Sequence, residues 1–232
     1  MIRKRPIIAI DGPVGAGKSV AARELARALG YSYLNTGAMY RAVAIAAREA
    51  SIDPDDPNVE QRLASVLKGI KIKFDGEKIL LNGRDVTAKK DDPEIGDLAS
   101  RFSAIDSVRA RMRELQRAAG ADGGVVMEGR DIGTAIFPDA EFKFFLVADV
   151  NTRARRRFVE LKKKGATVTE HEVLDQLIER DRRDSERELA PLRRADDAIE
   201  IDSTKLSIDA VVAAMKAKIN ARINAAKDLK RA

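Results

Sequence analysis

Five short apolar runs alternate with segments of helical periodicity along the chain. The first run, Ile7 to Ile10, contains no polar residue, which predicts a strand buried on both faces. Comparable runs stand at 123–128, 142–147 and 198–201, and a shorter one at 32–34. Strands that alternate with helices are typical of a parallel sheet covered by helices on both faces. We therefore predict an α/β fold with a five-stranded parallel sheet whose ligands bind at the carboxyl ends of the strands.

The pattern changes to period two in one part of the chain. Apolar and lysine residues alternate over 70–74, and Asp75-Gly76 and Asn82-Gly83 are dipeptides that favour tight hairpin turns. These features predict a small three-stranded antiparallel sheet. Because such a sheet is foreign to a parallel core, we predict an inserted subdomain over 58–92, which follows the Pro/Asp-rich break at 53–57.

The remaining segments are predicted to be helical. Pro93 after Asp92 starts a long helical region that is interrupted near 103–106, and Ser207 caps the closing helix. Helices near 152–164 and 169–183, joined at Gly165, form a hairpin. The predicted organisation is a core formed by 1–57, 93–152 and 189–232, the insertion at 58–92 and a helical lid at 153–188.

A glycine-rich loop directly follows the first strand. Gly12, Gly17, Lys18 and Ser19 fit the pattern G-x-x-x-x-G-K-[ST], the phosphate loop or P-loop. Its backbone N–H groups cradle phosphates, its lysine reaches the β- and γ-phosphates, and its serine hydroxyl binds Mg²⁺. A flexible turn is the alternative, but it must also explain the strand before and the helix after. The predicted ATP-binding residues are Gly12, Pro13, Val14, Gly15, Ala16, Gly17, Lys18, Ser19 and Val20.

Two further segments contain candidates for the same site. Glu128 ends the second apolar run, where phosphate-loop enzymes often place a carboxylate for Mg²⁺ or its water, so Ser19 and Glu128 are the predicted metal residues. The alternative is an acidic residue that only caps a loop. Thr36, Tyr40 and Arg41 open the next helix, and there the alternatives are a cap, a packed aromatic ring and a solvated charge.

The composition narrows the class of protein. There is no Cys and only one His, which excludes thiol catalysis, disulfides and thiolate metal sites and leaves oxygen atoms and phosphate to hold a metal. The net charge of +6 fits nucleic acid or small polyanions, but with 4% aromatic residues and no Trp we favour small polyanions and expect no nucleic-acid partner.

Hydrophobicity bears on the compartment. No apolar run approaches the roughly 20 residues that span a bilayer, and the start MIRKR leads into the first strand without a signal-peptide region. We therefore expect a cytoplasmic location and no membrane partner.

The segment 153–194 is rich in arginine, with ten Arg and three Lys. Arginine suits planar recognition of phosphate better than lysine does, whereas the run at 162–164 is expected to be a solvated helix face. We predict that the hairpin closes over a triphosphate, with Arg156 and Arg180 acting beside Lys18 in catalysis.

Four motifs together make the chain resemble bacterial cytidylate kinases. They are DGPVGAGKS at 11–19, LNTGAMYR at 34–41, EGRDIGT with FPDA at 128–140, and ERDRRDSERELAPL at 179–192. The resemblance covers essentially the whole chain. It implies a phosphate-loop kinase that transfers phosphate from ATP, with Mg²⁺, to CMP or dCMP. A monomer is expected.

The resemblance also implies roles for individual residues. Arg41, Arg130 and Arg187 would bind the acceptor phosphate, and Ser100, Arg109 and Asp131 would contact cytosine. Thr36 and Tyr40 would lie beside the acceptor, and Arg180 and Asp184 near its ribose.

Two other functions remain open at this point. One is another small-molecule kinase of the same fold, of the adenylate or shikimate type. The other is a nucleic-acid-stimulated ATPase or a GTPase switch, although no N-K-x-D motif for guanine occurs in the sequence. For a kinase the scarcity of His is no obstacle, because an acceptor phosphate with a second pKa of roughly 6 needs no general base.

Overall fold

The computed structural model describes residues 5–76 and 78–228. The predicted outer ends of the core, 1–4 and 229–232, lie outside the described residues. The chain divides into two compact units, which we describe separately: the first is formed by Met1–Leu34 with Gly120–Ala232, and the second by Asn35–Ala119.

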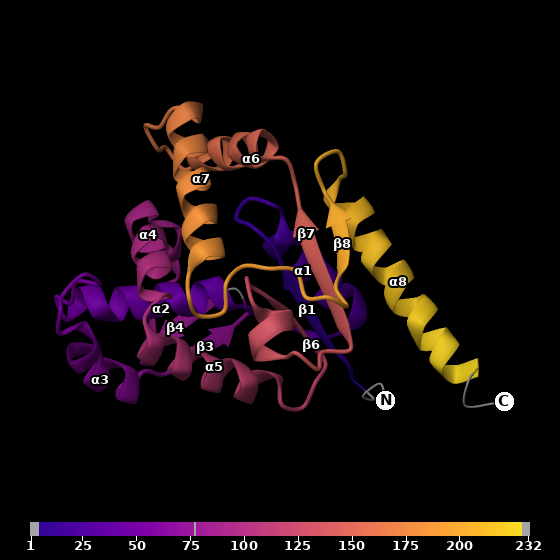
Figure 1. The fold of residues 1–232 in the computed structure, drawn as a ribbon, viewed down its shortest axis with the longest axis horizontal. Helices are drawn as coiled ribbons and strands as arrows, with labels where there is room; N and C mark the ends of the chain where they lie inside the picture. Colours follow the sequence, from indigo (N-terminus) through magenta and orange to yellow (C-terminus); the bar gives the residue numbers. More distant parts are fainter. Residues whose placement is uncertain (1–4, 77, 229–232) are drawn as a thin grey trace. The chain divides into compact units, whose positions relative to one another are not determined.

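A five-stranded parallel sheet organises the first unit (Figure 1). The strand order is β2-β6-β1-β7-β8, and β1 pairs in parallel with both β6 and β7. The predicted parallel sheet with flanking helices is thus confirmed. The strands are β1 (Ile7–Asp11), β2 (Ser32–Asn35), β6 (Val125–Glu128), β7 (Phe142–Val147) and β8 (Ile199–Asp202).

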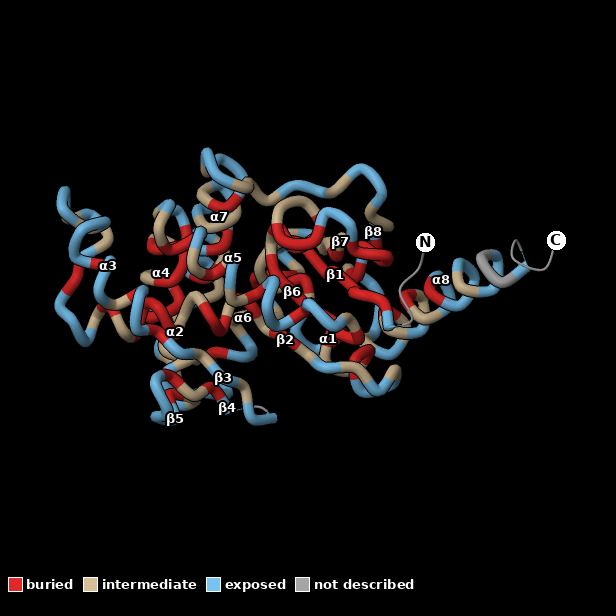
Figure 2. Tube along the Cα trace, turned by 90° about the horizontal axis from the view of Figure 1, so that it is seen from below, coloured by how far each residue is buried: buried red, intermediate tan, exposed pale blue. Residues whose placement is uncertain are grey.

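The central strand β1 is buried along its whole length (Figure 2). Its side chains Ile8 and Ile10 share one apolar cluster with residues of α1 (Lys18–Leu29) and α8 (Ile208–Asp228). In register, Ile10 lies beside Glu128 of β6 and Asp11 beside Phe145 of β7. The carboxyl ends of these strands therefore carry both the glycine-rich loop and the carboxylate of Glu128.

The predicted arginine-rich hairpin is formed by α6 (Val150–Lys163) and α7 (Glu170–Glu186). Gly165 joins them with a φ of +82°, and Thr169 and Glu172 form a reciprocal capping box at the start of α7. The hairpin has a small apolar core of its own, formed by Ala154, Leu161, Val173 and Leu177. Val14 of the glycine-rich loop packs against this core.

The second unit contains the predicted antiparallel sheet, with strand order β3-β4-β5. Because α2 to α5 belong to the same compact unit as this sheet, the narrower boundary at 58–92 stays a prediction. Its elements are α2 (Thr36–Glu49), α3 (Val59–Gly69), β3 (Ile72–Asp75), β4 (Lys78–Leu81), β5 (Arg84–Asp85), the 3₁₀ helix η1 (Thr87–Asp91), α4 (Pro93–Phe102) and α5, which runs from Asp106 to Gly120 at the boundary of the units.

Capping residues explain where several of these helices begin. The Asn35 side chain accepts a hydrogen bond from the backbone N–H of Ala38, and Asp92 accepts one from Glu94 with Pro93 as the first helical residue. The predicted interruption near 103–106 separates α4 from α5. Across residues 5–76 and 78–228, no helix combines the length and the apolar character needed to span a bilayer.

Candidate active site

Two glycines give the loop after β1 its path. Gly12 has a φ of +142°, and a Cβ there would lie 2.1 Å from the carbonyl oxygen of Leu146 in β7. Gly15 has a φ of +78°, and its Cβ would lie 3.0 Å from that of Arg153. The loop therefore runs against the backbone of β7 and the start of α6, where a larger residue does not fit.

Lys18 lies buried at the start of α1. Its Nζ donates a hydrogen bond to the carbonyl oxygen of Pro13 at 2.7 Å. The pKa of Lys18 is lowered to about 7. Burial is the largest cause and the positive charge of Arg130 adds to it, while Glu128 and other carboxylates partly oppose it. Negative charge placed near its Nζ, such as that of a phosphate group, would favour the charged form of Lys18.

The two predicted metal residues are an exposed hydroxyl and a buried carboxylate. Ser19 is exposed on α1, whereas Glu128 is 4% exposed and its Oε1 accepts a hydrogen bond from the Tyr33 hydroxyl at 2.9 Å. Oxygen donors of this kind suit Mg²⁺, which usually keeps several waters and binds one or two carboxylates plus substrate phosphates. Among residues 5–76 and 78–228, no three His, Cys, Asp or Glu side chains are grouped so that they could hold a metal ion.

Two ion pairs bring together four residues that were predicted to bind the acceptor. Arg130 Nε donates to Asp184 Oδ2 at 2.8 Å, and Arg187 Nη2 lies 3.5 Å from Asp131 Oδ1. Burial by itself would raise the pKa of the Asp184 carboxyl, but the charges of Arg130 and other arginines outweigh it and hold this pKa below its ordinary value. The Asp184 carboxylate is therefore ionised and keeps Arg130 in place.

Asp11, the last residue of β1, was not predicted to have a role. Its Oδ1 accepts a hydrogen bond from the backbone N–H of Ile132 at 2.9 Å, and its Oδ2 accepts one from Gly133 at 2.7 Å. Both donors open the short π-helix η2 (Ile132–Ile136), which follows Arg130 and Asp131. An acidic residue at the end of a buried strand, directly before the loop, was the available signal in the sequence.

Arg153 connects the hairpin to the glycine-rich loop. Its guanidinium donates to the carbonyl oxygens of Ala148 at 2.9 Å and Val14 at 3.1 Å, and to Asp181 of α7 at 2.5 Å. The first residue of the predicted lid, Arg153, is thus hydrogen-bonded to the glycine-rich loop.

The predicted catalytic arginines have different surroundings. Arg156 donates to Ser203, a residue that sequence reasoning missed and that follows β8. Arg180 lies in α7, where its charge helps to lower the pKa of Asp184. Other arginines of the hairpin form exposed ion pairs, such as Arg155 with Glu170 and Arg182 with Glu179, which is the solvated-face behaviour expected of a charge run.

The second unit holds the other predicted acceptor residues. Thr36 is buried at the start of α2, with Tyr40 and Arg41 on the next turn. Arg109 of α5 donates to the carbonyl oxygen of Ser103 at 3.2 Å. The Ser100 hydroxyl is buried and has no hydrogen-bond partner among the described residues. Buried hydroxyls are normally hydrogen-bonded, so this group is a candidate to bind a ligand.

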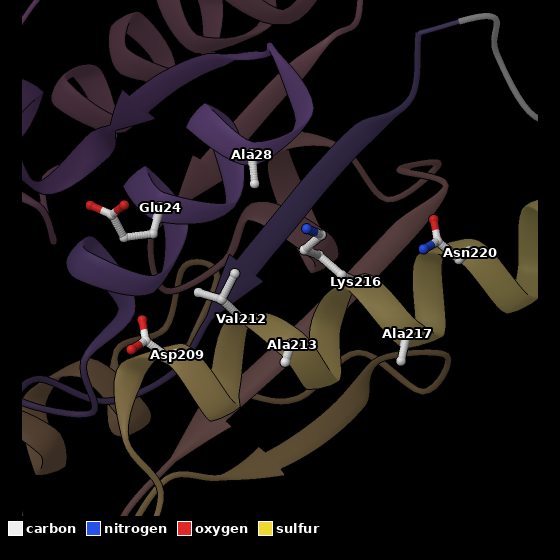
Figure 3. A pocket seen from close by; sticks show the side chains of 8 residues that line it. All are labelled: Glu24, Ala28, Asp209, Val212, Ala213, Lys216, Ala217 and Asn220. Carbon is white, nitrogen blue, oxygen red and sulfur yellow. The ribbon is translucent and has the colours of Figure 1, made fainter.

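A separate hollow lies between α1 and α8 (Figure 3). Small and charged side chains from both helices face it. None of the predicted site residues lines it, so we assign it no part in the chemistry. Its lining residues are Glu24, Ala28, Asp209, Val212, Ala213, Lys216, Ala217 and Asn220.

Comparison with known proteins gives one consistent family. The family model for cytidylate kinase matches residues 8–221. A cytidylate kinase of Citrifermentans bemidjiense is 49% identical over 221 residues, covering 94% of each chain, and one of Geobacter sulfurreducens is 47% identical over 95% of each. A cytidylate kinase of Thermotoga neapolitana is 43% identical over 94% of this chain and 98% of its own.

Among solved structures, an uncharacterized protein from Eubacterium ventriosum shares the fold, with a TM-score of 0.51 and 16% identity over 94% of this chain and 99% of that one. The family match does not favour the adenylate-type or shikimate-type alternative. With a phosphate loop around a buried lysine and a family match across nearly its whole length, the chain belongs to the cytidylate kinase family.

Proposed function

We propose that this chain transfers the γ-phosphoryl group of ATP to CMP or dCMP, giving ADP and CDP or dCDP. Its membership of the cytidylate kinase family carries this proposal. The buried Lys18 at the end of the glycine-rich loop supports it, because a lysine there stabilises the charge that develops on the transferring phosphoryl group.

The loop residues 12–20 bind the phosphates of ATP in this proposal. Backbone N–H groups of the loop and of the first turn of α1 hold the phosphate oxygens. Lys18 turns from the carbonyl oxygen of Pro13 to the β- and γ-phosphates, which restores its full positive charge.

Mg²⁺ would be held by the Ser19 hydroxyl, by Glu128 directly or through water, and by the phosphates. When bound, it neutralises part of the phosphate charge. Tyr33 then acts as a positioning residue, because its hydroxyl fixes one oxygen of the Glu128 carboxylate.

The proposed acceptor-binding residues follow from the resemblance to the family. Arg41, Arg130 and Arg187 hold its phosphate, and Ser100, Arg109 and Asp131 contact cytosine. Thr36 and Tyr40 lie beside the acceptor, and Arg180 and Asp184 lie near its ribose. The unpartnered Ser100 hydroxyl supports the cytosine assignment, since a buried hydroxyl is normally hydrogen-bonded.

The hairpin α6–α7 acts as the lid that excludes water during transfer, so that ATP is not hydrolysed. Arg180 and Arg156 are its proposed catalytic arginines. We also propose that the enzyme works as a monomer in the cytoplasm, where ATP is available, without nucleic acid or a membrane as partner.

The test is a panel of initial rates with ATP and Mg²⁺ against CMP, dCMP, UMP, AMP and shikimate. Turnover of CMP or dCMP well above the others is expected. Preferred use of AMP or shikimate would reject the acceptor assignment, and ATP hydrolysis that depends on added nucleic acid would reject the kinase.

A further inference from the structure

Asp11 holds a buried carboxylate in the first unit that the proposed chemistry does not use. It is 5% exposed, and both of its oxygens accept backbone N–H groups from the first turn of η2. The first N–H groups of any helix lack a partner within that helix. Asp11, at the end of strand β1, therefore accepts the hydrogen bonds of these two N–H groups.

The usual partner for these groups is the residue just before the helix. An aspartate in that position commonly accepts a hydrogen bond from the second or third residue of the helix. Asp131 occupies the position before η2, yet its side chain makes no capping hydrogen bond within the described chain. Its Oδ1 lies 3.5 Å from Nη2 of Arg187 instead.

We propose that Asp11 is a positioning residue for acceptor choice: by capping η2 from β1, it fixes the backbone directly after Asp131, holds the Asp131 carboxylate in place for the base, and so contributes to the preference for CMP over UMP. This inference rests on the proposed contact between Asp131 and cytosine. Cytosine offers an amino donor at N4 to a carboxylate, whereas uracil offers a carbonyl oxygen there.

The packing around Gly133 shows how closely this segment is held. A Cβ on Gly133 would lie 3.1 Å from Cδ of Lys143 and 3.4 Å from Oδ2 of Asp11. Lys143 is itself fixed by the carbonyl oxygen of Pro138 at 2.5 Å and by Asp197 at 2.9 Å. A shift of the Asp11 carboxylate is therefore transmitted to the backbone that carries Asp131.

The experiment measures the ratio of kcat/KM for CMP to that for UMP in four proteins: wild type, Asp11→Asn, Asp131→Asn and the double variant. Asparagine offers one acceptor oxygen, so it can satisfy only one of the two N–H groups. We expect Asp11→Asn to lower the ratio about tenfold, the effect of losing one hydrogen bond to a charged group. Because both residues act through one contact, the double variant should have the ratio of Asp131→Asn alone.

Glu141→Gln is the matched control. Glu141 is also buried and accepts the backbone N–H of Ile7 at 3.0 Å, at the other end of β1. In Glu141→Gln the ratio of kcat/KM for CMP to that for UMP is expected to stay at the wild-type value. Hydrogen exchange should be faster at the amides of Ile132 and Gly133 in Asp11→Asn than in wild type or the control.

The outcomes separate the inference from the proposed function. If Asp131→Asn lowers the ratio but Asp11→Asn does not, the inference is overturned and the base contact stands. If Asp131→Asn leaves the ratio unchanged, the base contact fails and the inference fails with it. If Asp11→Asn does not fold, Asp11→Ser replaces it. Unprotected amides at 132 and 133 in the wild type would overturn the cap without any variant.

Discussion

The guanidinium of Arg156 holds two oxygens of Ser203, with Nη1 donating to the hydroxyl at 3.2 Å and Nη2 to the backbone carbonyl at 2.7 Å. The same hydroxyl lies 3.0 Å from the carbonyl oxygens of Ala16, in the glycine-rich loop, and of Val147, at the end of β7. Ser203 therefore ties α6, β7 and the loop together at one buried point.

Removing this hydroxyl should weaken ATP binding. In Ser203→Ala the buried carbonyl oxygen of Ala16 loses a donor, which costs about 1 to 3 kcal/mol of stability. We expect the KM for ATP to rise about tenfold, corresponding to about 1.4 kcal/mol, while the KM for CMP stays unchanged. Arg155→Ala is the control, because Arg155 forms an exposed pair with Glu170. Equal changes in both KM values would contradict a specific link to the loop.

Lys18→Ala should lower kcat by roughly a hundredfold or more, because a donor to the transferring phosphoryl group is lost where charge develops. Circular dichroism and thermal unfolding check that the variant is folded. Lys163→Ala, on the exposed end of α6, is the control and is expected to keep wild-type turnover. Near-normal kcat in folded Lys18→Ala would reject the phosphate-loop assignment.

Asp131→Asn should narrow the preference for CMP over UMP, because an amide can turn either its oxygen or its NH₂ group toward the base. A site built on a required hydrogen bond rejects an analogue that lacks it strongly. Steady-state kinetics with both nucleotides give the result. An equal loss of kcat/KM for CMP and UMP would mean that Asp131 only orients Arg187, its neighbour at 3.5 Å.

The free energy of unfolding should depend on pH through the titration of Asp11. The pKa of Asp11 is raised from its ordinary 3.8 to about 6. Burial is the largest cause; the N–H groups of Gly133 and Ile132 and the charge of Lys18 oppose it, and the charge of Asp131 adds to it. Between these two values the native state binds more protons than the unfolded chain, so the contribution of Asp11 to the free energy of unfolding decreases as pH rises.

Relative to Asp11→Asn, the wild type should therefore lose about 2 kcal/mol of stability between pH 4.5 and pH 7, from about 1.36 kcal/mol per pKa unit. Urea unfolding of both proteins at each pH measures this difference in the free energy of unfolding. A stability difference that does not change with pH would show that Asp11 has an ordinary pKa.

Gly12→Ala should disrupt the loop, because the new Cβ would lie 2.1 Å from the carbonyl oxygen of Leu146. Gly165→Ala is the control for backbone strain alone, since its φ is also positive but nothing lies within 4 Å of its Cβ. We expect the control to lose about 1 kcal/mol in thermal unfolding and to keep ATP binding. The Kd for ATP, measured by calorimetry, should be at least roughly tenfold higher in Gly12→Ala than in the control, because the new Cβ overlaps directly with backbone.

The sequence predicted the elements well because local patterns define them. The apolar run from Ile7, the hairpin turns at Asp75-Gly76 and Asn82-Gly83, and the capping residues Asn35 and Asp92 all act over a few positions. The P-loop was found for the same reason, since its residues are contiguous and their spacing alone indicates the chemistry.

The contacts that hold the site together could not be predicted in this way. Asp11 and Gly133, Tyr33 and Glu128, and Arg156 and Ser203 are each joined across long stretches of sequence. No periodicity reports such pairs, because they depend on which strand ends meet at one edge of the sheet. The arginine excess of the hairpin was equally ambiguous, since exposed ion pairs and phosphate ligands use the same residue type.

The position of β1 at the centre of the sheet also bears on how the protein is made. This strand is synthesised before the other strands of its sheet, and its partners β6 and β7 follow only after residues 35–119 have been translated. Until β6 emerges from the ribosome, Ile7 to Ile10 have no paired strand, and until β7 emerges the glycine-rich loop lacks the backbone it runs against. We expect the nascent chain to expose an unpaired apolar strand while residues 12–124 are synthesised, so that slow, late pairing makes this enzyme dependent on chaperones when it is produced at high levels.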